Sequence, residues 1–346
     1  GGGGGGVGGW GAGLAWGGSG AAGGSQEDFD YGPLRAVLEA MEAGEWVRAL
    51  QLIGPMQFGQ TPGAIWFIAG VGGAVWLVFL LQCGHRGGGV RGRLIGLGLA
   101  GFVLGALSVF PTLLWVLGEE VFLGIEGGAG SLGGLIFQIA SVGLREEVLK
   151  LLFFAPLLPG LLWLARRGGS GGELDALVVA GCVGLGFAAQ ENVSYYEWTQ
   201  ATAGTGRFLT STFLHVSLTG LTGHALYRGF RYRGHCWSEG AVVLGLAIVA
   251  HGLYNGFAGM GAMGDMAVLS LIVFGVCAYA FLRELGKLRE RGETAVSLSA
   301  TFYGGFAVFV SVVLVYLTVM FGFKPALGLA FGDAVGLAIV FVLFAR

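Results

Sequence analysis

Long runs of uncharged, mostly apolar residues recur along the chain from residue 64 onward. A run of about 20 apolar residues is long enough to cross the hydrocarbon core of a bilayer as an α-helix. The pattern therefore predicts an all-α, polytopic transmembrane bundle of about nine spans, within a range of roughly eight to ten. The expected spans are residues 64–82, 94–117, 132–155, 176–193, 208–227, 240–258, 266–282, 301–322 and 326–345.

The third span is ambiguous, because its apolar residues continue past Pro156 and Pro159 to Ala165 and could cross the membrane once or twice. Loops rich in Arg and Lys stay in the cytoplasm. Basic and acidic loops alternate along the whole chain only if this region crosses once. The charge pattern then predicts a multi-pass protein of the cell membrane, with its N-terminal segment outside and its C-terminus, Arg346, in the cytoplasm.

Two segments precede the first span. The first 26 residues are mostly glycine and carry no charge, which predicts a flexible leader rather than a signal peptide. Residues 33–53 have apolar side chains at helical spacing with a break at Gly44, which predicts a small amphipathic helical hairpin at the membrane surface. The expected division of the chain is a leader with this hairpin at 1–63, a transmembrane core at 64–290 and an accessory transmembrane hairpin at 291–346.

Composition supports the membrane class and excludes others. Of the 346 residues, 54% are hydrophobic and 12% are charged, against about 25% charged in an ordinary soluble chain. A net charge of −2 leaves no basic surface for nucleic acid. Glycine contributes 70 residues without a collagen period, and the Gly101 and Gly105 pair indicates close helix packing. The four cysteines show neither a disulfide framework nor a zinc spacing.

Charged residues inside the expected spans are the exception that points to function. Four of the six lie within six positions of the third span, where they could cost on the order of 10 kcal/mol unless they are paired or hydrated. Lys150 shares a helical face with Glu146 and Glu147 and can pair with one of them. Since two adjacent carboxylates cannot both be ionised cheaply in a low dielectric, one is expected to exchange protons as a general acid or base. A structural ion pair is the alternative. The six residues are Arg145, Glu146, Glu147, Lys150, Glu191 and Asp333.

Later spans add polar residues at compatible depths in the membrane. Glu191 lies near the outer end of its span, His215 about two turns into the next, and His251 and Asn255 one turn apart in the outer half of another. A single water-accessible cavity that opens to the outside explains why independent helices carry them. His224 lies nine residues after His215, near the inner interface, and is expected not to be catalytic.

Two chemistries suit such a cavity. A glutamate could take a proton from water while His and Asn hydrogen-bond the oxyanion that forms on a carbonyl. Alternatively, one divalent metal such as zinc could be held by some of these side chains and activate the water. The H-E-x-x-H arrangement that would favour zinc strongly is absent. The possible metal ligands are Glu146, Glu191, His215 and His251.

Four motifs on successive spans carry a family resemblance. They are E-E-x-x-K (Glu146, Glu147, Lys150), F-x-x-x-E-N (Phe187, Glu191, Asn192), a mid-helix His215, and H-x-x-Y-N (His251, Tyr254, Asn255). Together they resemble the PrsW family of intramembrane proteases, over roughly residues 64–285. That family is related to the CAAX prenyl proteases and bacteriocin-processing enzymes, which have the motifs E-E-x-x-x-R, F-x-x-x-H and H-x-x-x-N. The earlier Lys and the Glu in place of His favour PrsW.

The resemblance implies an intramembrane endopeptidase that cleaves a single-pass membrane protein. Family members are associated with cleaving membrane-anchored anti-sigma factors on the outer side of a bacterial membrane. It leaves metal dependence open, and the paired glutamates with Lys150 favour the metal-free alternative. The expected catalytic residues are Glu146, Glu147, Glu191, His215, His251 and Asn255, and the expected supporting residues are Lys150, Asn192, Phe187 and Tyr254.

Two rival functions use the same residues differently. An ion- or proton-coupled transporter would use the Glu, His and Lys cluster as a relay, although the two halves of the chain show no convincing internal repeat. A purely structural membrane protein would explain the glycines but not the polar cluster. The sequence indicates no oligomeric state.

Overall fold

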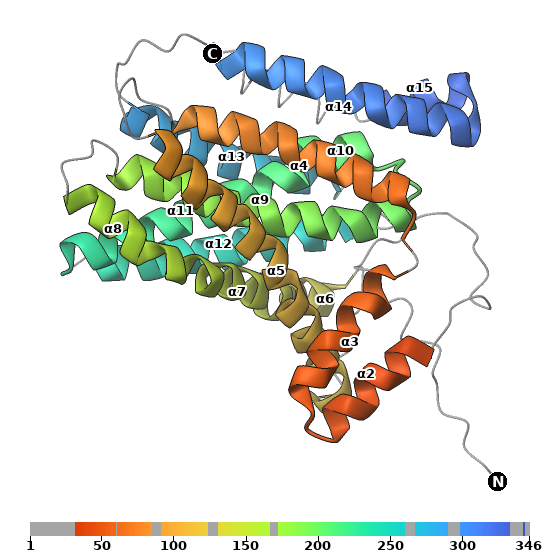
Figure 1. Cartoon of the computed structure of the whole chain (residues 1–346), viewed down its shortest axis with the longest axis horizontal. Helices are drawn as coiled ribbons and strands as arrows, with labels where there is room; N and C mark the ends of the chain where they lie inside the picture. Colours follow the sequence, from red (N-terminus) through yellow and green to blue (C-terminus); the bar gives the residue numbers. More distant parts are fainter. Residues whose placement is uncertain are drawn as a thin grey trace.

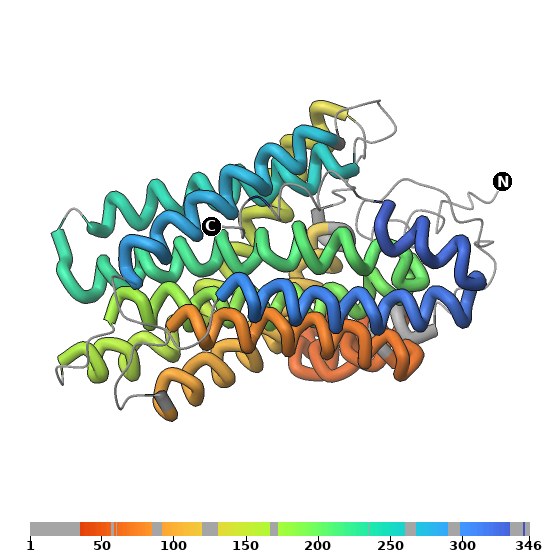
Figure 2. Tube along the Cα trace, turned by 90° about the horizontal axis from the view of Figure 1, so that it is seen from above, coloured from red at the N-terminus to blue at the C-terminus, as the bar shows by residue number. Residues whose placement is uncertain are grey.

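The computed structural model describes residues 32–59, 61–84, 91–123, 131–166, 172–234, 236–259, 267–289, 298–332 and 342, and within them all regular structure is helical. The all-α prediction is therefore confirmed. The expectations for the first 26 residues and for Asp333 fall outside the described residues. Figures 1 and 2 show the long helices running side by side. The helices longer than one turn are α2 (Gly32–Glu42), α3 (Trp46–Phe58), α4 (Gly63–Cys83), α5 (Arg91–Leu123), α6 (Leu132–Phe137), α7 (Leu144–Phe154), α8 (Leu158–Arg166), α9 (Gly172–Trp198), α10 (Gly204–Leu209), α11 (Ser211–Tyr232), α12 (Cys236–Gly259), α13 (Ala267–Arg289), α14 (Leu298–Phe321) and α15 (Phe323–Phe331).

In the described part of the chain, seven helices are long and apolar enough to cross a membrane, so the predicted count of nine is not confirmed. The expected span 208–227 corresponds to α11, which has 22 residues but carries more polar side chains than these seven. Most of α11 is buried among other helices, and its polar side chains include His215, which contacts Glu191 of α9 and Lys150 of α7. The expected span 326–345 overlaps α15, which has nine residues.

The predicted end of the third span at residue 155 is wrong. One continuous helical stretch of 35 residues runs from Leu132 to Arg166, which agrees with a single crossing. It contains a π-helical segment at Gln138–Gly143 and a 3₁₀ turn at Ala155–Leu157. Proline lacks a backbone N–H, but a change to tighter 3₁₀ geometry accommodates Pro156 without ending the helix.

Helix α9 is the most buried of the candidate spans, and glycines let α5 and α11 approach it closely. A Cβ atom on Gly105 would overlap the carbonyl oxygen of Val183, and one on Gly184 would overlap that of His215. Gly101 also faces α9, at Val179. The predicted close packing at Gly101 and Gly105 is therefore confirmed, as a contact within this chain.

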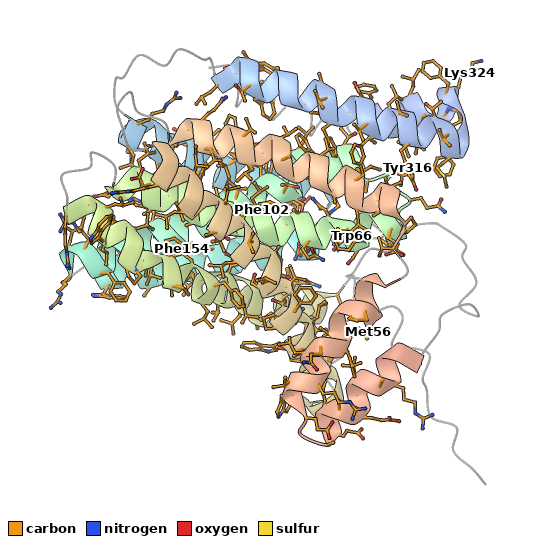
Figure 3. The ribbon with its side chains drawn as sticks, in the orientation of Figure 1. Met56, Trp66, Phe102, Phe154, Tyr316 and Lys324 are labelled. Atoms are coloured by element: carbon orange, nitrogen blue, oxygen red, sulfur yellow. The ribbon has the colours of Figure 1, made fainter. Side chains whose placement is uncertain are left out.

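The predicted hairpin before the first span is also present, as α2 and α3 with a turn at Gly44, whose φ is +73°. Its apolar face packs on α5 and α9, where the described residues Val37 and Ile53 belong to one cluster with Leu117 and Phe187. Met56 of α3 also packs against this cluster (Figure 3). The hairpin is thus anchored to the bundle at α5 and α9, and Figure 1 shows it beside the lower end of α5.

The C-terminal helix α14 lies along α4 in both orthogonal views (Figures 1 and 2). An aromatic cluster joins them: the Trp76 ring lies 5.5 Å from that of Phe302 and 4.8 Å from that of Phe213 on α11. The division into a leader, a core and an accessory C-terminal hairpin stays a prediction, since the second arm of that hairpin falls largely outside the described residues.

Candidate functional site

The charged residues of the third span lie on α7 and at its start, directly after the π-helical segment. Glu146, Glu147 and Lys150 have no exposed surface. Arg145 belongs to a separate cluster, in which its guanidinium donates to Glu119 Oε2 at 2.7 Å and to Ser141 Oγ at 2.8 Å. Glu119, which follows the expected span 94–117, lies within α5.

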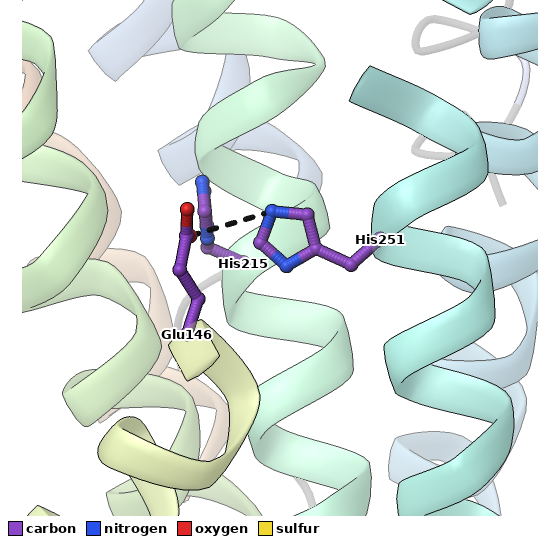
Figure 4. Close-up of side chains that lie close together, drawn as sticks. All are labelled: Glu146, His215 and His251. Atoms are coloured by element: carbon purple, nitrogen blue, oxygen red, sulfur yellow. Dashed lines mark ion pairs between the residues drawn. The ribbon is translucent and has the colours of Figure 1, made fainter. Parts of the chain in front are cut away.

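Three of the predicted catalytic residues converge from three helices. Glu146 of α7, His215 of α11 and His251 of α12 each offer one ligand atom, and these atoms all lie within 4.8 Å of one another (Figure 4). His251 Nε2 is 3.4 Å from Glu146 Oε2. The two imidazole rings are 5.0 Å apart and nearly perpendicular. All three side chains are at least 98% buried.

Glu147 and Lys150 support this group from one side. Lys150 Nζ donates to Glu147 Oε1 at 2.5 Å, so the predicted pairing of Lys150 with one glutamate is confirmed. The same Oε1 atom is 2.7 Å from His251 Nδ1. Glu147 therefore orients His251, whose other ring nitrogen faces Glu146.

Glu191, Phe187 and Lys150 surround the other histidine. His215 Nε2 is 3.0 Å from Glu191 Oε2, and His215 Nδ1 is 3.0 Å from Lys150 Nζ. The Phe187 ring lies 5.3 Å from the imidazole, and Lys150 Nζ lies 4.7 Å from the centre of that ring. Phe187 also belongs to the cluster under the α2–α3 hairpin, so it connects that hairpin to the site.

Arg207 of α10 is a site residue that sequence reasoning missed. It donates to Glu191 Oε2 at 2.7 Å and to Asn192 Oδ1 at 2.8 Å, and its guanidinium lies 3.4 Å from the centre of the Tyr195 ring. The only signal in the sequence is that Arg207 is a single basic residue in a loop expected to be external. Neither its spacing nor its neighbours indicate which helix it reaches.

The remaining predicted residues lie at the edge of the cluster. Asn192 also donates to Thr212 Oγ1 at 3.0 Å, and the Tyr254 hydroxyl is 3.0 Å from that of Thr210. Asn255 is half-buried, one turn after His251, and no hydrogen bond joins it to another described residue. His224 lies apart from the cluster, with Nε2 3.1 Å from Glu173 Oε2.

The site is closed in this conformation. The acidic and imidazole side chains of the cluster each expose at most 6% of their surface. The predicted opening to the outer side is therefore not visible as exposed surface on these side chains.

The surroundings of Glu146 fit a bound divalent cation. Both of its carboxylate oxygens are buried without a hydrogen-bond partner among the described residues, and so is Glu147 Oε2. A buried carboxylate left this way is costly. One carboxylate and two imidazoles are a common set of protein ligands in catalytic zinc sites, so Glu146, His215 and His251 fit a divalent metal. A histidine that binds a metal through one ring nitrogen usually donates from the other nitrogen to a carboxylate or carbonyl. Glu147 lies at that position, Nδ1, of His251.

A family comparison agrees with this geometry. The model of the PrsW family intramembrane metalloproteases matches residues 95–282, more than half of the chain. The chain belongs to this family. The match begins within α5 and ends within α13, and it includes every residue of the cluster described above. The hairpin α2–α3 and helices α14 and α15 lie outside it. Comparisons with curated proteins and with solved structures gave no match.

Membership of the PrsW family confirms the predicted resemblance and makes the protein a membrane-embedded protease. This decides against the transporter and purely structural alternatives. The description of the family as metalloproteases, together with the Glu146, His215 and His251 group, favours the metal alternative over the metal-free one.

Proposed function

We propose that this PrsW protease hydrolyses a peptide bond in a single-pass membrane protein at the group formed by Glu146, His215 and His251. The observation that carries the proposal is the orphaned Glu146 carboxylate, which lies between two imidazoles in the interior of the bundle. A water molecule and a scissile carbonyl would have to reach this point, so the closed arrangement must open for substrate.

Glu146, His215 and His251 would hold the divalent ion, for which zinc is the expected choice. When bound, such an ion polarises a carbonyl and makes water easier to deprotonate. We assign proton abstraction to Glu147, because its Oε1 is fixed by Lys150 and His251 while its Oε2 has no partner among the described residues. The proton accepted at Oε2 would then pass to the leaving amine.

Asn255 is the proposed donor to the oxyanion. It lies one turn after His251 on the same face of α12, and its amide makes no hydrogen bond to another described residue. A preorganised donor of this kind typically contributes about 10²- to 10³-fold in rate.

The substrate is proposed to be a membrane-anchored protein of the anti-sigma-factor type, cleaved from the extracytoplasmic side. The alternation of basic and acidic loops supports this orientation, since it places the start of the Leu132–Arg166 stretch outside and Arg166 inside. The lipid bilayer would bring the two proteins together in one plane.

The test is cleavage by purified protease, reconstituted in liposomes with a single-pass substrate that has an anti-sigma-factor-type external segment. Glu146→Gln and Glu147→Gln should each abolish turnover while thermal unfolding stays close to that of the parent protein. Glu39→Gln is the matched control, because Glu39 forms an exposed pair with Arg35 on α2. Undiminished cleavage by both active-site variants would overturn the proposed mechanism.

A further inference from the structure

Arg207 connects a short helix near the expected outer end of the bundle to the interior of the site. Its three contacts on α9 are Glu191, Asn192 and Tyr195, and all three lie within one turn of that helix. The guanidinium uses two different nitrogens for the first two contacts, so its plane is fixed. Only 14% of the side chain is exposed. The contact therefore belongs to the packed interior and is not a surface ion pair.

The contact with Arg207 fixes the Glu191 carboxylate next to His215. One oxygen, Oε2, accepts from Arg207 at 2.7 Å and lies 3.0 Å from His215 Nε2. On the opposite side of the ring, Lys150 Nζ is 3.0 Å from Nδ1. An ammonium group can only donate, so Nδ1 accepts and Nε2 carries the proton toward Glu191. Both nitrogens of His215 are therefore engaged, and one must be released for His215 to ligate.

Glu191 and His215 are both chemically suited to bind the proposed metal. Without Arg207, the Glu191 carboxylate would be a buried anion 3.0 Å from His215, one of the proposed ligands, and a bound metal would then be its most favourable new partner. A fourth protein ligand would fill the position that a catalytic site keeps open for water.

We propose that Arg207 is a positioning residue that holds Glu191 as the hydrogen-bond partner of His215 and keeps it from becoming a metal ligand. This inference rests on the proposed metal-dependent function. It predicts an unusual combination, in which loss of the arginine strengthens metal binding and weakens catalysis.

The experiment measures zinc affinity in the full-length protein by competition with a chelator of known affinity, and cleavage of the single-pass substrate in parallel. Arg207→Gln should bind zinc about 10-fold more tightly and lose about 10- to 100-fold in kcat, with a smaller change in KM. Arg207→Lys keeps the charge but not the two-pronged geometry, so it should lie between the parent and Arg207→Gln. Arg48→Gln, which breaks an exposed pair with Glu45, should change neither quantity.

Repeating the Arg207→Gln substitution in a Glu191→Gln protein shows whether Arg207 acts through Glu191. In Glu191→Gln protein there is no carboxylate to release, so adding Arg207→Gln should give no further gain in zinc affinity. The same gain in both backgrounds would overturn the inference, and so would an unchanged or weaker affinity in Arg207→Gln alone. If that variant does not fold, an affinity of Arg207→Lys equal to that of the parent overturns it. A parent protein that cleaves without binding zinc would instead overturn the proposed metal centre, and this inference with it.

Discussion

Glu147 Oε1 lies 2.7 Å from His251 Nδ1, on the side of the ring opposite the nitrogen that faces Glu146. Two consecutive glutamates of α7 therefore lie at the two ring nitrogens of one histidine of α12. A carboxylate at Nδ1 fixes the tautomer in which Nε2 has its lone pair free toward Glu146. Adjacent residues of the same type thus have different tasks.

Substitution should separate those two tasks. Glu146→Gln removes a proposed ligand, so the purified protein should no longer retain zinc after dialysis. Glu147→Gln should retain zinc with an affinity lowered by about 10- to 100-fold, while cleavage falls by about 10²- to 10⁴-fold because the proton acceptor is lost. Elemental analysis and the liposome assay measure both effects. Equal zinc retention by the two variants would contradict this assignment.

Two buried histidines provide a matched pair for the proposed ligand set. His251→Gln should remove both zinc retention and cleavage. His224→Gln should leave both intact, because His224 contacts Glu173 outside the cluster. Its only expected effect is a loss of stability of about 1–3 kcal/mol, from leaving Glu173 without this partner. Thermal unfolding in detergent measures that loss. Loss of zinc from His224→Gln would show that the ligand set is misassigned.

Two glycines of α12 test how tightly the site is held. A Cβ on Gly252 would lie 2.5 Å from the backbone nitrogen of Ile139 and 2.6 Å from the Gln138 carbonyl oxygen, so Gly252→Ala must push α12 away from the π-helical segment. We expect a stability loss of about 1–3 kcal/mol and a large loss of cleavage, since His251 is the neighbouring residue. Gly245→Ala on the same helix meets nothing within 4 Å and should be neutral or slightly stabilising. Similar unfolding temperatures for both variants would contradict the close contact.

Chelation tests the metal requirement without any substitution. Dialysis of the parent protein against a strong chelator should abolish cleavage, and adding back zinc alone should restore it, because Glu146, His215 and His251 remain in place to bind the ion. Asn255→Ala is the useful companion, since it should lose about 10²- to 10³-fold in rate with zinc still bound. Full activity in metal-free protein would favour the glutamate-only alternative.

Membrane orientation can be checked in a protein that lacks its four native cysteines, all of which are buried. Leu132→Cys, at the start of α6, should react with a membrane-impermeant maleimide on intact cells. Ser238→Cys, near the start of α12, should react only after lysis, because the basic loop before it is expected to be cytoplasmic. The reverse pattern would place the site on the cytoplasmic side.

Sequence reasoning located the site by asking where charges occur in apolar spans. It found Glu146, Glu147 and Lys150 because an intramembrane charge is costly and therefore conspicuous. The same reasoning could not find Arg207 or pair Arg145 with Glu119, because both contacts join residues far apart in the chain and neither follows from helical spacing. It also counted α11 as one more span; this helix is less apolar than the seven candidate spans, and most of it is buried among other helices.

The π-helical segment at Gln138–Gly143 has a consequence for the register of the whole Leu132–Arg166 stretch. The residues that meet α12 come at intervals of four: Leu135 at Gly256, Ile139 at Gly252, Gly143 at Ile248 and Glu147 at His251. On a regular α-helix each such step drifts by about 40°, or about 120° over three steps. The wider turn offsets most of this drift, so the same face of the stretch still meets α12 at Glu147. The slower winding of the π-helical segment thus helps to keep Glu147 on the side of the stretch that faces His251.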